Sequence, residues 1–267
     1  MESVRLDALL VRRGLFSSRE KAKNAIQEGQ VLVGGKPERK PSFLCPEDTV
    51  LQVTAPAERY VSRGGYKLER ALELFSVPCE DACCLDLGAS TGGFTDCLLQ
   101  HGARRVIAVD VGTGQLAASL RNDPRVLSLE KTDFRSLRPE SFPEPVSLVT
   151  GDLSFISLRL LFPLLRTFSD GNAVLLVKPQ FEAGRSAVGK GGIVRSPAVH
   201  ERVLLEICAA AAQQGLTVQG LAPSPICGGD GNVEYLLYLG LTGTVQETCP
   251  PDCAAVVRQG MALSARK

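Results

Sequence analysis

The sequence LDLGASTGGF at residues 85–94 joins a short apolar run to a glycine-rich turn. The segment that follows, Phe94–Gln100, has the amphipathic spacing of a helix. Glycines at such a turn let the backbone bend tightly and come close to a ligand. The N-terminus of the helix adds free N–H groups and a positive dipole. This strand, turn and helix therefore predict a binding site at the carboxyl end of the strand.

Apolar runs of strand length recur along the chain and mostly alternate with helical segments. The predicted strands are Cys83–Leu87, Val106–Val109, Val126–Leu129, Val146–Thr150, Ala173–Val177, Leu216–Leu221 and Glu234–Leu241. This alternation is typical of an α/β fold with a mostly parallel, seven-stranded sheet, the Rossmann-like arrangement. No clear helix separates the last two runs, which favours an antiparallel hairpin at the edge of the sheet.

The composition is that of an ordinary globular protein, with 44% hydrophobic and 22% charged residues among 267. It excludes a disordered chain, a collagen-like repeat and a coiled coil. No apolar run approaches the ~20 residues of a membrane span, and Met1–Arg5 lacks the apolar segment of a secretory signal. Nine cysteines without such a signal indicate reduced thiols in a cytoplasmic protein. Cys249 and Cys253 have no second ligand pair, so no metal is expected. No membrane partner is expected either, because no apolar run is long enough to span a membrane.

The charges are unevenly divided along the chain. Residues 1–70 contain 13 basic and 9 acidic residues, whereas residues 71–267 contain 17 and 20. A basic N-terminal module on a mildly acidic body predicts a polyanionic partner that binds at one end. The candidate contacts to this partner are Arg5, Arg12, Arg13, Arg19, Lys21, Lys23 and Arg63.

The basic module has the pattern of a small α+β domain. A short helix is predicted over Arg5–Arg13, and a second begins at the capping-box pattern Ser17–Glu20 and ends near Gly29. Short strands are expected at Val31–Val33, Lys36–Pro37 and Val50–Val53, with a linker at Ala55–Ala57. The predicted domains are residues 1–58, a linker and first helix at 59–81, a main domain at 82–245 and a tail at 246–267.

Asp110 follows the second strand of the main domain, about twenty residues after the glycine turn. A carboxylate there can hold both hydroxyls of a ribose, so the two features predict a nucleoside cofactor. The glycines match neither the G-x-G-x-x-G dinucleotide fingerprint nor a phosphate-binding loop of the type G-x-x-x-x-G-K-[ST]. Asp86, just before the turn, is unfavourable beside a pyrophosphate but suits a cationic ligand. These features indicate S-adenosylmethionine.

The third strand would supply the contacts to adenine. Asp133 would accept a hydrogen bond from the exocyclic amine, and Phe134 would pack on the ring. The predicted cofactor-binding residues are Asp86, Gly88, Ala89, Ser90, Thr91, Gly92, Gly93, Phe94, Asp110, Asp133 and Phe134.

Four charged residues lie where the order of the strands would bring them together. Lys67 precedes the main domain, Asp152 follows the fourth strand, Lys178 ends the fifth, and Glu234 opens the last. A lysine at the end of an apolar strand is costly to desolvate without carboxylate partners. Each of the four alone could be an ordinary surface or ion-paired residue, but the strand order would bring the two lysines and the two carboxylates together.

On this scaffold, the four residues resemble the K-D-K-E tetrad of the FtsJ-like 2′-O-ribose RNA methyltransferases. The strings SRGGYKL, GASTGGFT, DLSFIS and KPQFE resemble the TlyA family (haemolysin A-like proteins), and the likeness covers nearly the whole chain. The resemblance implies an N-terminal S4 RNA-binding domain. It also implies S-adenosylmethionine-dependent methylation of cytidine 2′-hydroxyls in ribosomal RNA, in 16S alone or in 16S and 23S. Ribosomal RNA or ribosomal subunits would then be the partner.

The chemistry agrees with this resemblance. A ribose 2′-hydroxyl is a poor nucleophile and must lose its proton as it attacks a methyl group. Lys178 is the candidate general base, although a free lysine is protonated at neutral pH. Burial and the neighbouring Lys67 would favour the neutral amine, whereas Asp152 and Glu234 would favour the ammonium. Asp152 would orient Lys178, and the remaining pair would hold the ribose.

Other functions stay open at this point. The chain could methylate another RNA or a small molecule, or it could bind RNA with a vestigial methyltransferase fold. The complete set of four charged residues argues against the vestigial fold. A membrane-lytic protein is a further alternative, but no strongly cationic amphipathic helix supports it. In the glycine-rich stretch Gly184–Pro197, the basic side chains could contact RNA phosphates or could simply be solvated.

Overall fold

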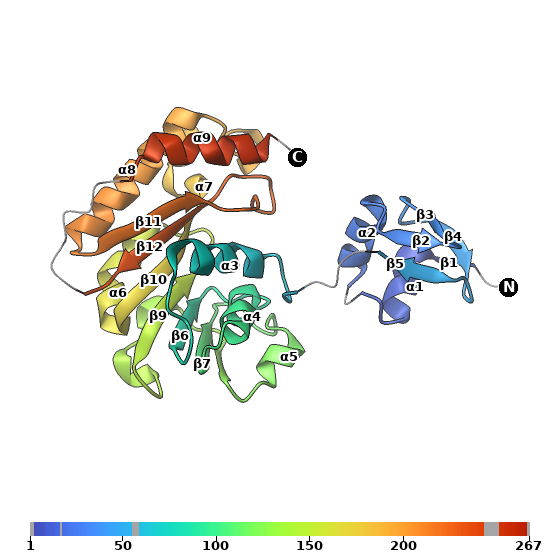
Figure 1. Cartoon of the computed structure of the whole chain (residues 1–267), viewed down its shortest axis with the longest axis horizontal. Helices are drawn as coiled ribbons and strands as arrows, with labels where there is room; N and C mark the ends of the chain where they lie inside the picture. Colours follow the sequence, from blue (N-terminus) through green and yellow to red (C-terminus); the bar gives the residue numbers. More distant parts are fainter. Residues whose placement is uncertain (1–2, 17, 55–58, 243–250, 266–267) are drawn as a thin grey trace. The chain divides into compact units, whose positions relative to one another are not determined.

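The computed structural model describes residues 3–16, 18–54, 59–242 and 251–265, and it divides into two compact units. The first unit comprises residues 1–59 and the second residues 60–267 (Figure 1). The predicted linker at Ala55–Ala57 lies outside the described residues.

The N-terminal unit packs two helices against short antiparallel strands. Its elements are β1 (Ser3–Arg5), α1 (Leu6–Arg12), α2 (Arg19–Gln27), β2 (Val31–Val33), β3 (Lys36–Pro37), β4 (Leu44–Pro46) and β5 (Leu51–Val53). Strand β1 pairs with β4, and β2 pairs with both β3 and β5. The core consists of side chains from both helices together with Val31 and Cys45. Apolar residues at helical spacing therefore account for the packing of this small unit.

Two local predictions for this unit need correction. The first helix begins at Leu6 rather than Arg5, because Ser3–Arg5 forms a strand too short to show an alternating pattern. The second helix is capped by Ser18, whose side chain accepts a hydrogen bond from the Lys21 backbone N–H at 3.3 Å. Ser17, the expected cap, lies outside the described residues.

The second unit is built on a seven-stranded sheet. Its strands are β6 (Cys83–Leu87), β7 (Arg105–Val109), β8 (Val126–Leu129), β9 (Val146–Gly151), β10 (Ser169–Val177), β11 (Thr217–Pro223) and β12 (Tyr235–Gly240). The spatial order is β11-β12-β10-β9-β6-β7-β8, and only the pairings of β12 are antiparallel. The predicted mostly parallel sheet is confirmed.

The last two strands form the antiparallel hairpin that was expected at the edge of the sheet. Strand β12 does not lie at the edge but inserts between β10 and β11. Every residue of β12 is buried, whereas β11 is only partly buried along most of its length. The fully apolar strand therefore occupies the interior position, and β11 becomes the edge.

Helices cover both faces of this sheet (Figure 1). They are α3 (Gly64–Phe75), α4 (Gly93–Gln100), α5 (Ala118–Arg121), α6 (Phe162–Phe168), α7 (Pro179–Glu182), α8 (Pro197–Gln213) and α9 (Cys253–Ser264). Short 3₁₀ turns occur at Phe134–Ser136, Pro139–Ser141, Leu158–Leu160, Arg185–Ala187 and Lys190–Gly192. One buried cluster contains side chains of α6, α8 and α9, and the other contains side chains of α3, α4 and α5. Alternate residues of each central strand enter opposite clusters, as the two-residue period of a strand requires.

The predicted tail contains a helix that packs on the sheet. Within residues 246–267, Cys253–Ser264 forms helix α9. The helix lies close to the sheet at Gly260, where an added Cβ would lie 2.9 Å from Val233 and 3.3 Å from Tyr235. Small residues on the packed side let the helix approach closely, and they also weaken its hydrophobic pattern.

A Gly260→Val substitution should lower the free energy of unfolding by about 1–3 kcal/mol, because the added atoms have no space against the sheet. Chemical denaturation of the full chain measures this change. Gln259→Val is the matched control, since Gln259 is an exposed residue of the same helix. Equal stability of the two variants would show that α9 does not pack as described.

Candidate active site

The glycine turn after β6 is shaped by its neighbours. Gly92 has a φ of 99°, and a Cβ at this position would lie 2.3 Å from the Leu120 side chain. A Cβ at Gly93 would lie 2.2 Å from the Ser62 hydroxyl. The turn therefore needs glycine at both positions, the first for its backbone conformation and both for close packing.

Asp110 connects this turn to the loop after β7. Its Oδ2 accepts a hydrogen bond from the Ser90 backbone N–H at 2.8 Å, and its Oδ1 accepts one from the Gly112 N–H at 2.7 Å. The carboxylate is half-buried. Residues twenty apart in the sequence are thus in direct contact, which places the Asp110 carboxylate beside the glycine turn.

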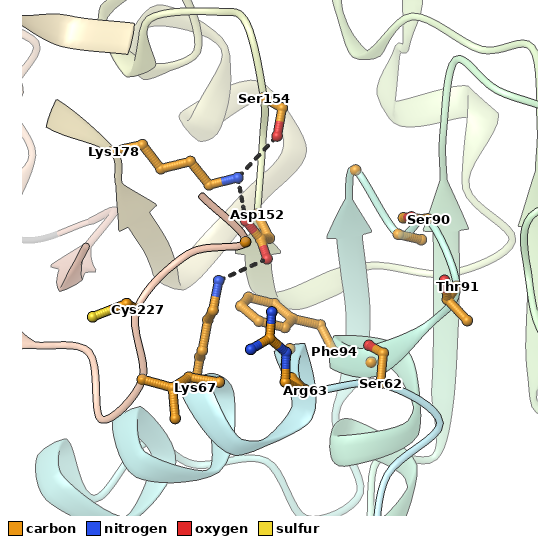
Figure 2. Close-up of a pocket in the computed structure, with 16 residues that line it drawn as sticks. Ser62, Arg63, Lys67, Ser90, Thr91, Phe94, Asp152, Ser154, Lys178 and Cys227 are labelled. Atoms are coloured by element: carbon orange, nitrogen blue, oxygen red, sulfur yellow. Dashed lines mark hydrogen bonds and ion pairs between the residues drawn. The ribbon is translucent and has the colours of Figure 1, made fainter. Parts of the chain in front are cut away.

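Two cavities adjoin at the turn. The first has a volume of about 320 Å³ and is lined by residues that include Lys67, Phe94 and Lys178 (Figure 2). The second has a volume of about 500 Å³ and is lined by residues that include Asp110 and Phe134. The residues common to both cavities are Gly88, Ser90, Asp152 and Ser154. Volumes of this size suit a small molecule.

The predicted cofactor residues are distributed over the two cavities. Ala89, Thr91, Gly93 and Phe94 line the first, and Asp110, Asp133 and Phe134 line the second. The Asp133 carboxylate is already engaged by the Arg135 side chain and its backbone N–H, and these hydrogen bonds lower the pKa of Asp133. Gly92 and Asp86 line neither cavity.

Asp86 lies beneath the turn rather than at its surface. Its carboxylate is fully buried and accepts hydrogen bonds from the hydroxyls of Thr95 at 2.7 Å and Thr150 at 3.1 Å. Burial raises the pKa of Asp86 to about 6, against the lowering effect of the two threonines. Asp86 was predicted to contact the cofactor because it precedes the glycines in the sequence. The sequence does not show whether the side chain at this end of the strand points to a cavity or into the protein interior.

The four charged residues of the predicted tetrad come together at one edge of the sheet. Lys67 belongs to α3, Asp152 and Lys178 follow β9 and β10, and Glu234 precedes β12. Because β12 runs antiparallel to β10, with Tyr235 opposite Val177, its start lies beside the end of that strand. The topology therefore places all four residues at the carboxyl ends of the parallel strands.

The side chains form a continuous network. Lys178 Nζ lies 2.6 Å from Asp152 Oδ1, and Lys67 Nζ lies 3.7 Å from Asp152 Oδ2 (Figure 2). Lys67 Nζ also donates a hydrogen bond to Glu234 Oε2 at 2.6 Å. Both lysines are 8% exposed and Glu234 is 3% exposed, so the charges are largely removed from water. Two ammonium groups and two carboxylates balance one another, which makes their burial tolerable.

The site also contains residues that were not singled out from the sequence. Lys178 Nζ also donates to the Ser154 hydroxyl at 2.9 Å. Ser62 and Cys227 line the first cavity. Ser154 belongs to the DLSFIS string, two residues after Asp152, and this spacing was the one available signal.

The basic residues of the N-terminal unit are held by carboxylates and carbonyls. Arg5 and Arg19 both bind Asp7, which is fully buried and whose pKa these hydrogen bonds lower to about 2. Arg12 pairs with Glu47, and Arg13 donates to the carbonyl oxygens of Glu47 and Thr49. Lys21 is partly exposed and Lys23 is exposed on α2. Arg63 belongs instead to the second unit, where it lines the first cavity (Figure 2).

Comparison with known proteins identifies the family to which this chain belongs. Residues 60–241 match the FtsJ-like methyltransferase family, and residues 4–51 match the S4 domain. The chain belongs to the FtsJ-like methyltransferase family. The resemblance inferred from the motifs is thereby confirmed, and the sheet with its glycine turn is the methyltransferase domain.

Relatives of this FtsJ-like methyltransferase match over most of its length. The 16S/23S rRNA (cytidine-2′-O)-methyltransferase TlyA of Mycobacterium tuberculosis is 49% identical over 88% of this chain and 89% of its own. Hemolysin A of Brachyspira hyodysenteriae is 40% identical over 88% and 99%. A solved Streptococcus thermophilus protein that carries the name hemolysin has a TM-score of 0.80 and 44% identity, with 100% and 98% coverage. None of the described helices has the length and apolar character needed to span a membrane.

Asp86→Asn should make the stability of this methyltransferase less dependent on pH. The raised pKa means that ionised Asp86 opposes folding, so its stabilising contribution, present in acid, is lost as the pH rises through about 4 to 6. The stability of the variant relative to the natural chain should therefore increase by about 2 kcal/mol between about pH 4.5 and pH 7.5.

Urea unfolding at both pH values measures this difference. Asp230→Asn is the control, because Asp230 is exposed and should leave the pH dependence unchanged. A variant with the same pH dependence as the natural chain would contradict the description of Asp86.

Proposed function

We propose that this chain transfers a methyl group from S-adenosylmethionine to the 2′-hydroxyl of cytidine in ribosomal RNA, with Lys178 as general base. The observation that carries the proposal is the network of Lys67, Asp152, Lys178 and Glu234 beside the glycine turn. The name of the Mycobacterium tuberculosis relative supports 16S and 23S RNA as substrates. A location in the cytoplasm, where cysteine thiols stay reduced, would agree with ribosomal RNA as the partner.

The residues of the two cavities fit S-adenosylmethionine. Asp110 offers a carboxylate for ribose hydroxyls, and Phe134 offers an apolar face for adenine beside Asp133. The glycine turn and Phe94 would hold the amino-acid portion in the first cavity. When bound, the cofactor supplies an electrophilic methyl group on a sulfonium. Asp86, below the turn, would stabilise the cradle rather than contact the ligand.

Lys178 would remove the proton of the 2′-hydroxyl while the oxygen attacks the methyl group. For this step its amine must be neutral, and the proton that it takes from the hydroxyl later passes to solvent through the cavity. Asp152 orients Lys178 by the contact at 2.6 Å. Lys67 pairs with both Asp152 and Glu234 and so holds the two carboxylates of the network in place.

The N-terminal S4 domain would hold the RNA. Arg5, Arg12, Arg13, Arg19, Lys21 and Lys23 would contact phosphates, and Arg63 would contact the RNA beside the first cavity. Contacts to phosphates position an RNA without reading its sequence. The choice of nucleotide would therefore come from the folded RNA and the shape of the catalytic cavity.

Transfer of tritium from labelled S-adenosylmethionine to separated 30S and 50S particles tests the proposal. Label should appear in RNA, and mapping of the alkali-resistant linkage should locate the modified cytidine. Failure of the natural chain to label either particle or its naked RNA would reject the function.

Lys178→Ala should lower kcat by roughly 10²–10⁴-fold, because the general base is removed. Binding of S-adenosylmethionine, measured by calorimetry, should persist. Lys178→Arg is the matched variant, since it keeps the positive charge but cannot lose a proton at neutral pH. Near-normal turnover by either soluble variant would show that Lys178 is not the base.

The double substitution Arg12→Gln and Lys23→Gln should weaken RNA binding and leave turnover at saturating RNA unchanged. Each lost phosphate contact should reduce the slope of log affinity against log salt by about 1. Binding titrations at several salt concentrations measure this slope. Arg166→Gln with Arg258→Gln is the control, because it removes the same charge from exposed positions of the second unit. Equal losses in both pairs would contradict a specific role for the N-terminal unit.

A further inference from the structure

Lys178 has two partners, and only one of them belongs to the tetrad. Its Nζ lies 2.6 Å from Asp152 Oδ1 and donates a hydrogen bond to Ser154 Oγ at 2.9 Å (Figure 2). Ser154 is exposed and lines both cavities, so its hydroxyl lies where the two spaces meet. This position makes it accessible to a bound substrate.

Ser154 restricts the rotation of the amine. Among the described residues, the contact to Asp152 is an ion pair in which Oδ1 accepts no hydrogen bond, so the hydrogen bond of Nζ is the one to Ser154. A lysine amine has tetrahedral geometry, so this bond fixes one of the three positions around Nζ, and the charge of Asp152 attracts a second hydrogen. When the proton is lost, the lone pair takes the remaining position, on the side of the first cavity that Lys178 lines.

The loop that carries Ser154 is held against the segment that carries Lys178. Phe155 has a φ of 63°, a left-handed conformation that is costly for a bulky side chain. Its ring packs on Phe181 with centroids 5.0 Å apart. The Ser157 hydroxyl donates to Glu182 Oε2 at 2.6 Å, and Glu182 Oε1 accepts from the Leu158 N–H at 2.8 Å.

These contacts join both sides of the site. Phe181 and Glu182 belong to α7, which begins immediately after Lys178. Contacts with α7, the helix that follows Lys178, therefore hold the strained loop in place. Strain that persists beside a reacting group is a feature of functional sites.

We propose that Ser154 is a positioning residue that directs the lone pair of Lys178 toward the ribose. The inference rests on the proposed function and adds a residue outside the K-D-K-E tetrad. A hydroxyl that accepts from Lys178 keeps its own hydrogen, which is then available to an oxygen of the substrate in the cavity. Ser154 thus acts on the base and leaves the proton transfer itself to Lys178.

Ser154→Ala in the full chain tests this role. With labelled S-adenosylmethionine and the particle that the natural chain methylates, kcat on the high-pH plateau should fall about tenfold, whereas cofactor affinity should stay within about twofold. Ser154→Thr keeps the hydroxyl and should restore kcat to within about threefold.

Ser119→Ala is the matched control, because Ser119 is an exposed serine of α5 away from the tetrad, and it should behave like the natural chain. Plateau turnover of Ser154→Ala within about twofold of the natural chain would overturn the proposal, as would a loss of kcat in Ser154→Thr equal to that in Ser154→Ala. If the alanine variant is poorly folded, the threonine variant decides, and its failure to support turnover overturns the proposal. Inactivity of the natural chain in the same assay would instead count against the proposed function.

Discussion

The contact of one carboxylate with two lysines is the constraint on which the catalytic unit depends. Asp152 lies 2.6 Å from Lys178 Nζ and 3.7 Å from Lys67 Nζ, and Glu234 completes the charge balance at 2.6 Å from Lys67. Two lysines at 8% exposure could not remain charged at this depth without carboxylates close by.

The order of strands is what makes this contact possible. Parallel strands β9 and β10 end at the same edge, which delivers Asp152 and Lys178 to neighbouring positions. The antiparallel insertion of β12 then brings Glu234 to that edge from its amino-terminal side. Helix α3 covers one face of the sheet and supplies Lys67. An open α/β sheet characteristically binds its ligands at this edge, where the glycine turn of this chain also lies.

The two units differ in how their charged side chains are exposed to solvent. In the N-terminal unit, buried Asp7 fixes two arginines whose side chains remain about half exposed, at 45% and 54%. A guanidinium has more donors than one carboxylate can use, so the arginines can be oriented and still bind phosphates. In the second unit, Lys67, Lys178 and Glu234 are buried and face one another. The two units thus differ in how far their paired charges are removed from water.

The pattern of apolar runs predicted the α/β domain and its seven strands, because strands and turns arise from nearby residues. The S4 domain and the set of four charged residues were predicted from the resemblance of the motifs to a known family. The burial of Asp86 under the turn, the place of β12 between β10 and β11 and the packed helix at residues 253–264 became known from the structure. It also revealed Ser154 as a partner of Lys178. Each of these depends on contacts between residues that are far apart in the sequence, and no local pattern along the chain specifies such contacts.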